Sequence, residues 1–174
     1  MKQETMKLGK LEIDMYDLRR FIVKSKKKGY AGQGIYKRAK DGSKIFTFQK
    51  GNFYYTDNYA GSPQAPGDEI VRWQKEDGQR IWHMHYSGGM LEKFWEDEEL
   101  SEKSFVFLKK MISQIPFRYP FRGPIGRSED KDFIYSNRVN GDIKRFGGNE
   151  KIYSKILKEI IFTQDYNGCL VVPK

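Results

Sequence analysis

Three carboxylates, Asp57, Glu69 and Glu150, are the side chains best suited to acid–base chemistry or to ligand binding. Asp57 and Glu69 flank one loop, and Glu150 lies in a later segment of similar sequence. Two carboxylates that face one cleft can serve as general acid and base or accept hydrogen bonds from a ligand. Carboxylates that accept loop N–H groups or pair with a base would give the same pattern, so both interpretations stay open.

Aromatic residues and histidines alternate in Trp82–Tyr86 (WHMHY) and supply a second set of candidates. Alternation along a strand places Trp82 and Tyr86 on one face and the two histidines on the other. The aromatic face, with Tyr55 and Tyr59 from an earlier strand, forms either core beneath a helix or the wall of a pocket. A His-x-His pair can begin a zinc or iron site, but these are the only two histidines in the chain. We therefore predict neither a metal nor a cofactor.

Lysine and arginine outnumber aspartate and glutamate by 32 to 23, which gives a formal net charge of +9. The densest basic cluster surrounds the end of the first predicted helix and could bind nucleic acid; it comprises Lys24, Lys26, Lys27, Lys28, Lys37 and Arg38. A solvated lysine-rich surface would look the same. Arg122, beside Gly123 and Pro124, is instead suited to hold a phosphate or carboxylate in a fixed fork.

Nucleophilic catalysis finds little support in the sequence. The single cysteine, Cys169, excludes an internal disulfide and a multi-cysteine metal site. The nucleophile elbow, the P-loop and the dinucleotide fingerprint after a strand are absent. No apolar run approaches the roughly 18 residues of a membrane span, and the first residues lack the apolar segment of a signal peptide. We therefore assign no catalytic residue and expect a cytoplasmic protein without a membrane partner.

Hydrophobic periodicity predicts helices over residues 14–28 and 98–114. Asp14 is a good N-cap for the first helix, Gly29 follows its end, and Pro116 follows the second helix. Alternating apolar residues and turn signals predict strands over 45–49, 53–59, 69–75, 80–86, 132–137, 149–154, 159–166 and 170–172. Residues 1–12 are charged and aperiodic, and we expect a flexible arm there.

The most informative feature is an internal similarity at a shift of 80 residues. Residues 53–61 align with 133–141 and residues 81–91 with 161–171; six of these twenty positions are identical, where about one is expected by chance. The sequence therefore predicts an α+β fold with one domain, 13–174, in which a helix plus about four antiparallel strands occurs twice (about 13–91 and 97–172). The two repeats would form a pseudo-twofold antiparallel sheet packed by two helices. Because Asn137 stands where the first repeat has Asp57, only the first half could carry an asymmetric charged site.

Several short motifs resemble a known family: GYAGQG (29–34), GNFYYTDNYAG (51–61), PGDEIV (66–71), IWHMHYSGG (81–89), FRGP (121–124), GGNEKIY (147–153) and DYNG (165–168). Over about residues 15–172 the chain is similar to an uncharacterised bacterial and archaeal domain of unknown function, found alone or C-terminal to Xre-type helix-turn-helix regulators. No activity is attached to that domain. The resemblance therefore implies a sensing or interaction role, by analogy with the regulators.

These observations together favour a non-enzymatic domain that binds, senses or sequesters a small anionic ligand in a cleft between the two halves. Tyr55, Tyr59, Trp82 and Tyr86 would form its walls, Asp57, Glu69 and Glu150 would accept hydrogen bonds, and Arg122 would pair with the anion. Two alternatives stay open. One is a nucleic-acid or regulator interaction through the basic surface, and the other is a hydrolase or lyase that uses Glu69 with Glu150 or Asp57.

Overall fold

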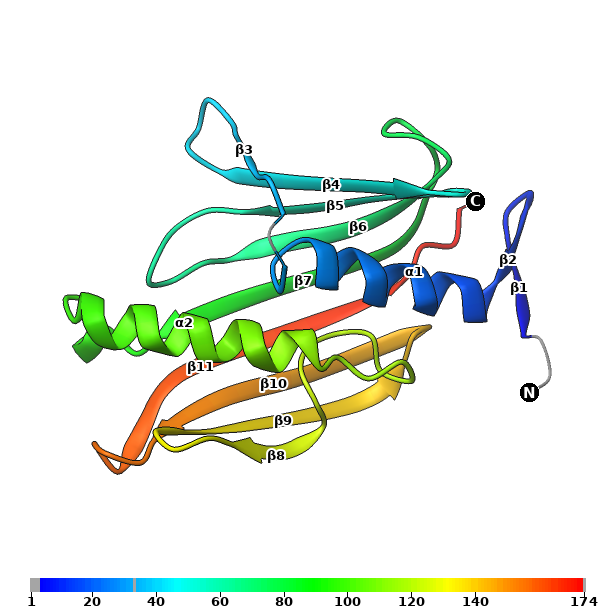
Figure 1. The fold of residues 1–174 in the computed structure, drawn as a ribbon. Coiled ribbons are helices and arrows are strands. Elements are labelled where there is room, and N and C mark those ends of the chain that lie inside the picture. The colour runs from blue at the N-terminus through cyan, green and yellow to red at the C-terminus, as the bar shows by residue number, and fades with distance from the viewer. Residues whose placement is uncertain (1–3, 33, 174) are drawn as a thin grey trace.

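The computed structural model describes residues 4–32 and 34–173, and in this part the chain forms two α-helices, a short 3-10 helix and eleven strands (Figure 1). The helices are α1 (Met15–Lys28) and α2 (Glu98–Ser113), and the 3-10 helix spans Glu92–Phe94. The strands are β1 (Thr5–Leu8), β2 (Leu11–Asp14), β3 (Lys37–Arg38), β4 (Lys44–Lys50), β5 (Phe53–Tyr59), β6 (Gly67–Trp73), β7 (Arg80–Met90), β8 (Gly126–Glu129), β9 (Phe133–Asp142), β10 (Arg145–Ser154) and β11 (Glu159–Leu170).

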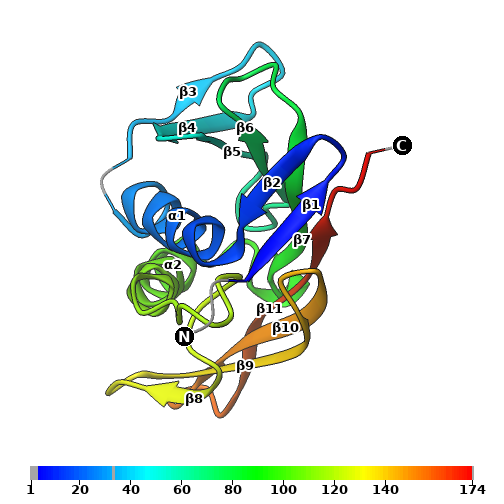
Figure 2. The same cartoon turned by 90° about the vertical axis from the view of Figure 1, so that its right-hand side faces the viewer.

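Nine strands form one antiparallel sheet in the order β3-β4-β5-β6-β7-β11-β10-β9-β8. The last strand of the chain, β11, therefore lies inside the sheet beside the central strand β7, where Tyr166 faces Tyr86. The sheet curves around α1 and α2, which lie side by side against its concave face (Figure 2). The predicted α+β class, with an antiparallel sheet and two helices, is confirmed.

Both helices begin at an aspartate that caps backbone N–H groups. Asp14 Oδ1 accepts hydrogen bonds from the N–H groups of Tyr16 and Asp17, at 2.8 and 3.1 Å. Asp97 Oδ1 accepts from the N–H of Leu100 at 2.9 Å. Both helices turn a buried stripe toward the sheet; α1 contributes Met15, Leu18, Phe21, Ile22, Ser25 and Lys26, and α2 contributes Ser101, Ser104, Phe107, Leu108, Met111 and Ile112.

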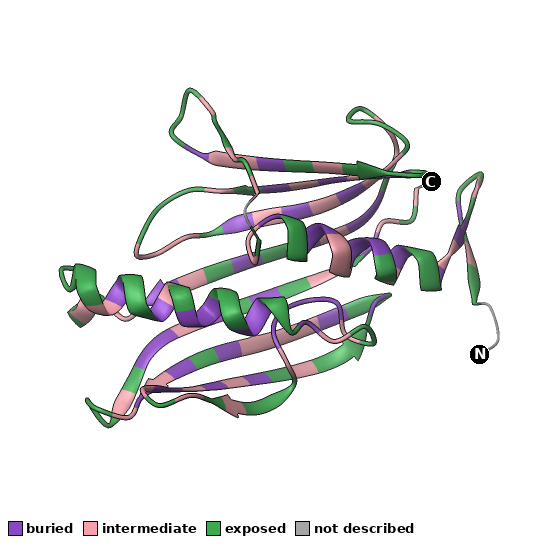
Figure 3. Ribbon diagram, in the orientation of Figure 1, coloured by how far each residue is buried: buried purple, intermediate pink, exposed green. Residues whose placement is uncertain are grey.

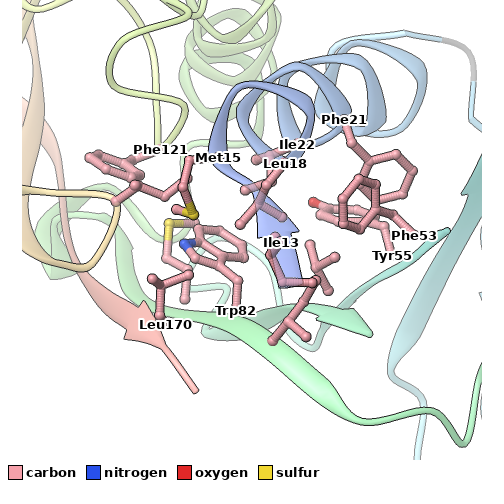
Figure 4. Packing of buried hydrophobic residues seen from close by; sticks show 14 of the residues in the cluster. Ile13, Met15, Leu18, Phe21, Ile22, Phe53, Tyr55, Trp82, Phe121 and Leu170 are labelled. Atoms are coloured by element: carbon pink, nitrogen blue, oxygen red, sulfur yellow. The ribbon is translucent and has the colours of Figure 1, made fainter. Parts of the chain in front are cut away.

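Burial alternates along the strands, so that one face of the sheet meets the helices (Figure 3). The core around α1 includes Met15, Leu18, Trp82 and Phe121 (Figure 4). Trp82 stacks on Phe146 with 5.9 Å between ring centroids. A second cluster, beneath α2, includes Leu108, Phe133, Ile152 and Phe162. The apolar side chains between sheet and helices hold the two layers together.

The N-terminal segment differs from the expectation. The flexible arm expected over residues 1–12 is wrong for residues 5–12, because β1 and β2 pair as a hairpin that continues into α1. Leu8 and Ile13 are fully buried and anchor the hairpin to the core. The first three residues of the expected arm lie outside the described residues. The charged residues of this segment face outward, and they mask a period-two alternation of Met6, Leu8, Leu11 and Ile13 across a turn.

The other differences concern sheet edges and one strand break. The edge strands β3 and β8 were not predicted, because short polar edge strands carry little apolar alternation. The break expected after residue 166 is absent, because Asn167 and Gly168 stay within the ladder opposite His85 and Met84. Within the described part of the chain, no helix combines the length and apolar character needed to cross a membrane.

Candidate ligand-binding site

A cavity of about 200 Å³ lies between the two helices and the sheet, where β5, β6, β7 and β11 contribute to its lining. Its polar lining consists of Lys26, Tyr30, Lys44, Tyr55, Asp57, Tyr59, Ser62, Glu69, Tyr86, Lys109, Arg122 and Gln164. Its apolar lining consists of Phe105, Leu108, Ile112 and Phe162, three of them from α2. A space of this size suits a small organic molecule rather than a single water.

The β5–β6 loop, residues 60–66, borders the cavity and is fixed against β7. The N–H of Ala65 donates to the carbonyl of Gly88 at 3.0 Å, and the N–H of Met90 donates to the carbonyl of Pro63 at 3.2 Å. Gly88 has a φ of 134°, and a Cβ on it would lie 2.3 Å from the carbonyl oxygen of Thr163. Only glycine allows β7 to pass here between the loop and β11.

Asp57 is the carboxylate at the centre of the polar wall. It points inward from β5, opposite Glu69 on β6, and is 4% exposed. Tyr86 donates its hydroxyl to Oδ1 at 2.8 Å, and Tyr36 donates to Oδ2 at 3.3 Å. Burial, together with the charge of Glu69, raises the pKa of Asp57 to about 7. Near neutral pH this carboxyl group can therefore accept a proton or release one.

Glu69 forms a buried ion pair with Lys26 of α1. The ammonium of Lys26 contacts both carboxylate oxygens of Glu69, and the two side chains are 2% and 3% exposed. Burial lowers the pKa of Lys26, whereas the charge of Glu69 opposes that change. The pair fixes the end of α1 to the sheet and leaves Glu69 largely neutralised at the cavity wall.

Arg122 reaches the cavity from the loop after α2. It is bound by Glu150, which lies outside the cavity lining. Its Nε donates to Glu150 Oε1 at 2.7 Å, and Nη2 donates to Gln164 Oε1 at 2.9 Å. The hydroxyl of Tyr135 donates to the other oxygen of Glu150 at 2.6 Å. The guanidinium lies 5.3 Å from the ring centroid of Tyr86. Arg122 is thus a fixed cation beside Asp57 and Tyr86.

In the second half of the sheet, the side chain that corresponds to Asp57 does not line the cavity. Asn137 lies opposite Glu150 on the neighbouring strand, as Asp57 lies opposite Glu69. Asn137 accepts the hydroxyl of Tyr166 at 2.7 Å and donates to the carbonyl of Gly123 at 2.9 Å. Its amide is therefore satisfied within the protein, whereas Asp57 faces the cavity.

Six of the eight side chains proposed from the sequence line the cavity; they are Tyr55, Asp57, Tyr59, Glu69, Tyr86 and Arg122. The other two do not line it. Trp82 is fully buried in the core, where it stacks on Phe146. Glu150 is fully buried behind Arg122, and both of its oxygens are bonded. The cleft expected to be shared by Glu69 and Glu150 is therefore not formed. The cavity still lies between the two halves, because α2, Arg122 and β11 of the second half line it together with strands of the first half.

Lys26 cannot contribute to the basic cluster proposed to bind nucleic acid. It is buried against Glu69 and cannot reach a phosphate backbone. Lys27, Lys28, Lys37 and Arg38 are exposed, and Lys24 is half-buried. The neighbouring ammonium of Lys50 lowers the pKa of Lys24. Nucleic-acid binding through these residues remains a prediction.

Sequence reasoning missed several lining residues, notably Lys26, Tyr30, Lys44, Lys109 and the apolar wall of α2. For Lys26 a signal was present. It follows Leu18 and Ile22 at intervals of four, on the apolar stripe of the helix, where a lysine needs a buried partner. For Lys44 and Lys109 no local pattern separates them from other surface lysines.

The two histidines lie on the face of the sheet opposite the cavity. His83 Nε2 lies 2.7 Å from Asp68 Oδ1, and His85 Nδ1 lies 3.5 Å from the same oxygen. Among the residues that the structure describes, no group of three or more histidine, cysteine or acidic side chains is arranged to hold a metal ion.

The fold and cavity describe an α+β domain with a small, charged, tyrosine-rich pocket beneath two helices. Residues 57–171 match a family described as a domain of unknown function, DUF5680, and the chain belongs to this family. Searches of curated proteins and of solved structures found no match.

Proposed function

We propose that this domain binds a small anionic organic molecule in the cavity between the sheet and the two helices and serves to sense or sequester it. The observation that carries the proposal is the cavity itself, in which fixed cations and tyrosine hydroxyls face an apolar wall. A pocket that combines apolar surface with a few convergent polar groups is typical of a ligand site. A link to Xre-type regulators, which the family resemblance implies, would suit a sensing role.

The charges of the lining favour an anion. Four cations line the cavity, Lys26, Lys44, Lys109 and Arg122, against two carboxylates, Asp57 and Glu69. Lys26 is paired with Glu69, and Arg122 is paired with Glu150 outside the lining. The pKa of Asp57, raised by burial, reduces its negative charge near neutral pH. The two remaining lysines leave the site positively charged overall.

Isothermal titration calorimetry with three probes tests the proposal. Phenylacetate and phenylphosphonate carry an anion on a small aromatic body, and phenethylamine carries a cation on the same ring. We expect saturable binding of at least one anion, weaker binding of the amine, and loss of anion binding in Leu108→Trp, which fills the cavity. Leu100→Trp, on α2 but outside the lining, is the control. A preference for the amine, or anion binding that Leu108→Trp leaves intact, would refute the proposal.

We infer in addition that the two halves arose by duplication. The strand order β4-β5-β6-β7 on one side is mirrored by β8-β9-β10-β11 on the other, with β7 and β11 adjacent. Tyrosine hydroxyls meet Asp57 in one half and Asn137 in the other. Superposition of residues 53–91 on 133–171 tests this inference, and equivalent strands that fail to overlay would refute it.

A second candidate function, acid–base catalysis as in a hydrolase or lyase, is favoured by the pKa of Asp57 and by its position opposite Glu69. Turnover of 4-nitrophenyl acetate and 4-nitrophenyl phosphate, compared between the wild type and Asp57→Asn, is the direct measurement. Saturable turnover lost in the variant would support catalysis, and identical rates would count against it.

A further inference from the structure

A second hollow, the vestibule, lies next to the cavity. The residues that line this vestibule include Tyr30, Tyr36, Arg38, Lys44, Tyr59 and Lys109. Tyr30, Lys44, Tyr59 and Lys109 line both the vestibule and the cavity, so the two spaces are adjacent and the two lysines border both.

The vestibule is cationic. Its lining, as far as the structure describes that region, includes Arg38, Lys44 and Lys109 and no carboxylate. The ammonium of Lys44 lies 5.5 Å from the ring centroid of Tyr59, and that of Lys109 lies 5.6 Å from the ring centroid of Tyr30. The two cations are thus each held near an aromatic ring of the vestibule. An anionic group would be favoured there.

At the inner end of the cavity the cations are already bonded to other side chains. Lys26 forms an ion pair with Glu69, and Arg122 donates to Glu150 and Gln164. The hydrogen bonds that Asp57 receives from the described residues come from the hydroxyls of Tyr36 and Tyr86. Two carboxylate oxygens offer about four lone-pair sites, so Asp57 keeps capacity for a further donor. Asp57 is therefore the inner acceptor best placed to bind a ligand donor.

We propose that the ligand has two unlike ends, an anionic group held by Lys44 and Lys109 in the vestibule and a hydroxyl that donates to Asp57 inside. Between the ends, an apolar or aromatic body lies against Leu108, Ile112 and Phe162. The ligand class is a small hydroxylated carboxylic acid or its phosphate or phosphonate counterpart. This inference rests on the proposed function, because it assigns the two ends of a ligand to the same cavity.

Four probes separate the ends. 4-Hydroxyphenylacetate carries both groups, phenylacetate lacks the hydroxyl, tyramine replaces the carboxylate by an ammonium, and 4-hydroxybenzylphosphonate replaces it by a phosphonate. In calorimetric titrations we expect 4-hydroxyphenylacetate or its phosphonate analogue to bind at least about tenfold more tightly than phenylacetate and tyramine. The better of the two anions identifies the charged group.

Two variants assign each end to its residues. Lys44→Ala with Lys109→Ala should weaken the hydroxylated anion about tenfold and leave tyramine unchanged. Asp57→Asn should reduce the preference for 4-hydroxyphenylacetate over phenylacetate to about threefold or less. Lys40→Ala with Lys110→Ala is the matched control, because both lysines are exposed and outside both linings, and it should change nothing. Thermal melting confirms that each variant is folded.

The outcomes separate the two proposals. If phenylacetate binds as tightly as 4-hydroxyphenylacetate and Leu108→Trp blocks both, the inference about the two ends is wrong and the anion-binding function stands. If the lysine pair variant binds the hydroxylated anion as the wild type does, the vestibule assignment is wrong. If none of the four probes binds, or tyramine binds most tightly, both proposals fail.

Discussion

Tyr86 and Tyr166 face each other across the adjacent strands β7 and β11, and each donates its hydroxyl to a buried side chain. Tyr86 donates to Asp57 at 2.8 Å, and Tyr166 donates to Asn137 at 2.7 Å. An acid at one place and an amide at the other make the two halves chemically different. Asp57 faces the cavity, whereas the amide of Asn137 donates to the carbonyl of Gly123.

Replacing Asn137 by aspartate and replacing Asp57 by asparagine should therefore change the free energy of unfolding by different amounts. Asn137→Asp replaces the group that donates to the carbonyl of Gly123 by a second acceptor in a site that is 1% exposed. We expect a loss of about 2–4 kcal/mol in the free energy of unfolding, measured in urea at pH 8. Asp57→Asn should cost less than 1 kcal/mol or stabilise the protein at that pH, since it removes a buried charge. Equal losses in the two variants would contradict this account.

Asp57 should also make stability depend on pH. Its folded pKa, about 7, is higher than the 3.8 of an ordinary aspartate, so the folded state binds more protons than the unfolded state between these values. Stability contributed by this group is present below about pH 4 and is lost as pH rises toward 7. The difference in unfolding free energy between the wild type and Asp57→Asn, followed from pH 4 to 8, should therefore move against the wild type. A constant difference would show that Asp57 titrates normally.

The Lys26–Glu69 pair should matter for stability far more than its neighbours on α1. Lys26→Met leaves the carboxylate of Glu69 buried without its cation, and we expect a loss of about 3–5 kcal/mol. Lys27→Met, one position further on and exposed, should change stability by less than about 0.5 kcal/mol. The double variant Lys26→Met with Glu69→Gln should recover part of the loss. Chemical denaturation of the four proteins measures these differences, and similar values for Lys26→Met and Lys27→Met would refute the buried pair.

Adjacent glycines in β10 should respond differently to alanine. A Cβ on Gly148 would lie 2.3 Å from Cζ of Tyr166, whereas a Cβ on Gly147 has its nearest neighbour at 3.8 Å. Gly148→Ala must displace the tyrosine and should cost about 1–3 kcal/mol. Gly147→Ala should be neutral or slightly stabilising, because alanine loses less backbone entropy than glycine. Thermal melting compares the two, and a more damaging Gly147→Ala would contradict the close approach.

Much of the fold was predictable because its long elements carry strong local signals. Asp14 as N-cap and the Met15–Leu18–Ile22 stripe predicted α1, and alternation in Phe53–Tyr59 predicted β5. The hairpin β1–β2 and the edge strands β3 and β8 are too short for alternation to stand out from charged neighbours. Those elements depend on tertiary packing, and a local sequence pattern does not predict that packing.

The side chains that form the polar wall of the candidate site were largely predictable from the sequence. The residues that contact them were not. Asp57 and Glu69 stand out in the sequence because they flank one loop, and Tyr86 stands out because alternation places it on the aromatic face of its strand. The sequence does not show that Glu150 binds Arg122, which lies in a loop 28 residues away, and Tyr135 of β9. Nor does it show that Lys109 of α2 lies near Lys44 of β4, because the approach of α2 to the sheet brings them together.

The position of β11 inside the sheet has a consequence for synthesis on the ribosome. Its partners β7 and β10 are made earlier, yet they cannot be joined until the final strand emerges. Until then β7 presents an unpaired edge that includes the buried Met84, Tyr86 and Met90. A nascent chain that stalls before residue 159 would carry this open edge, and the cell would have to shield it from other chains.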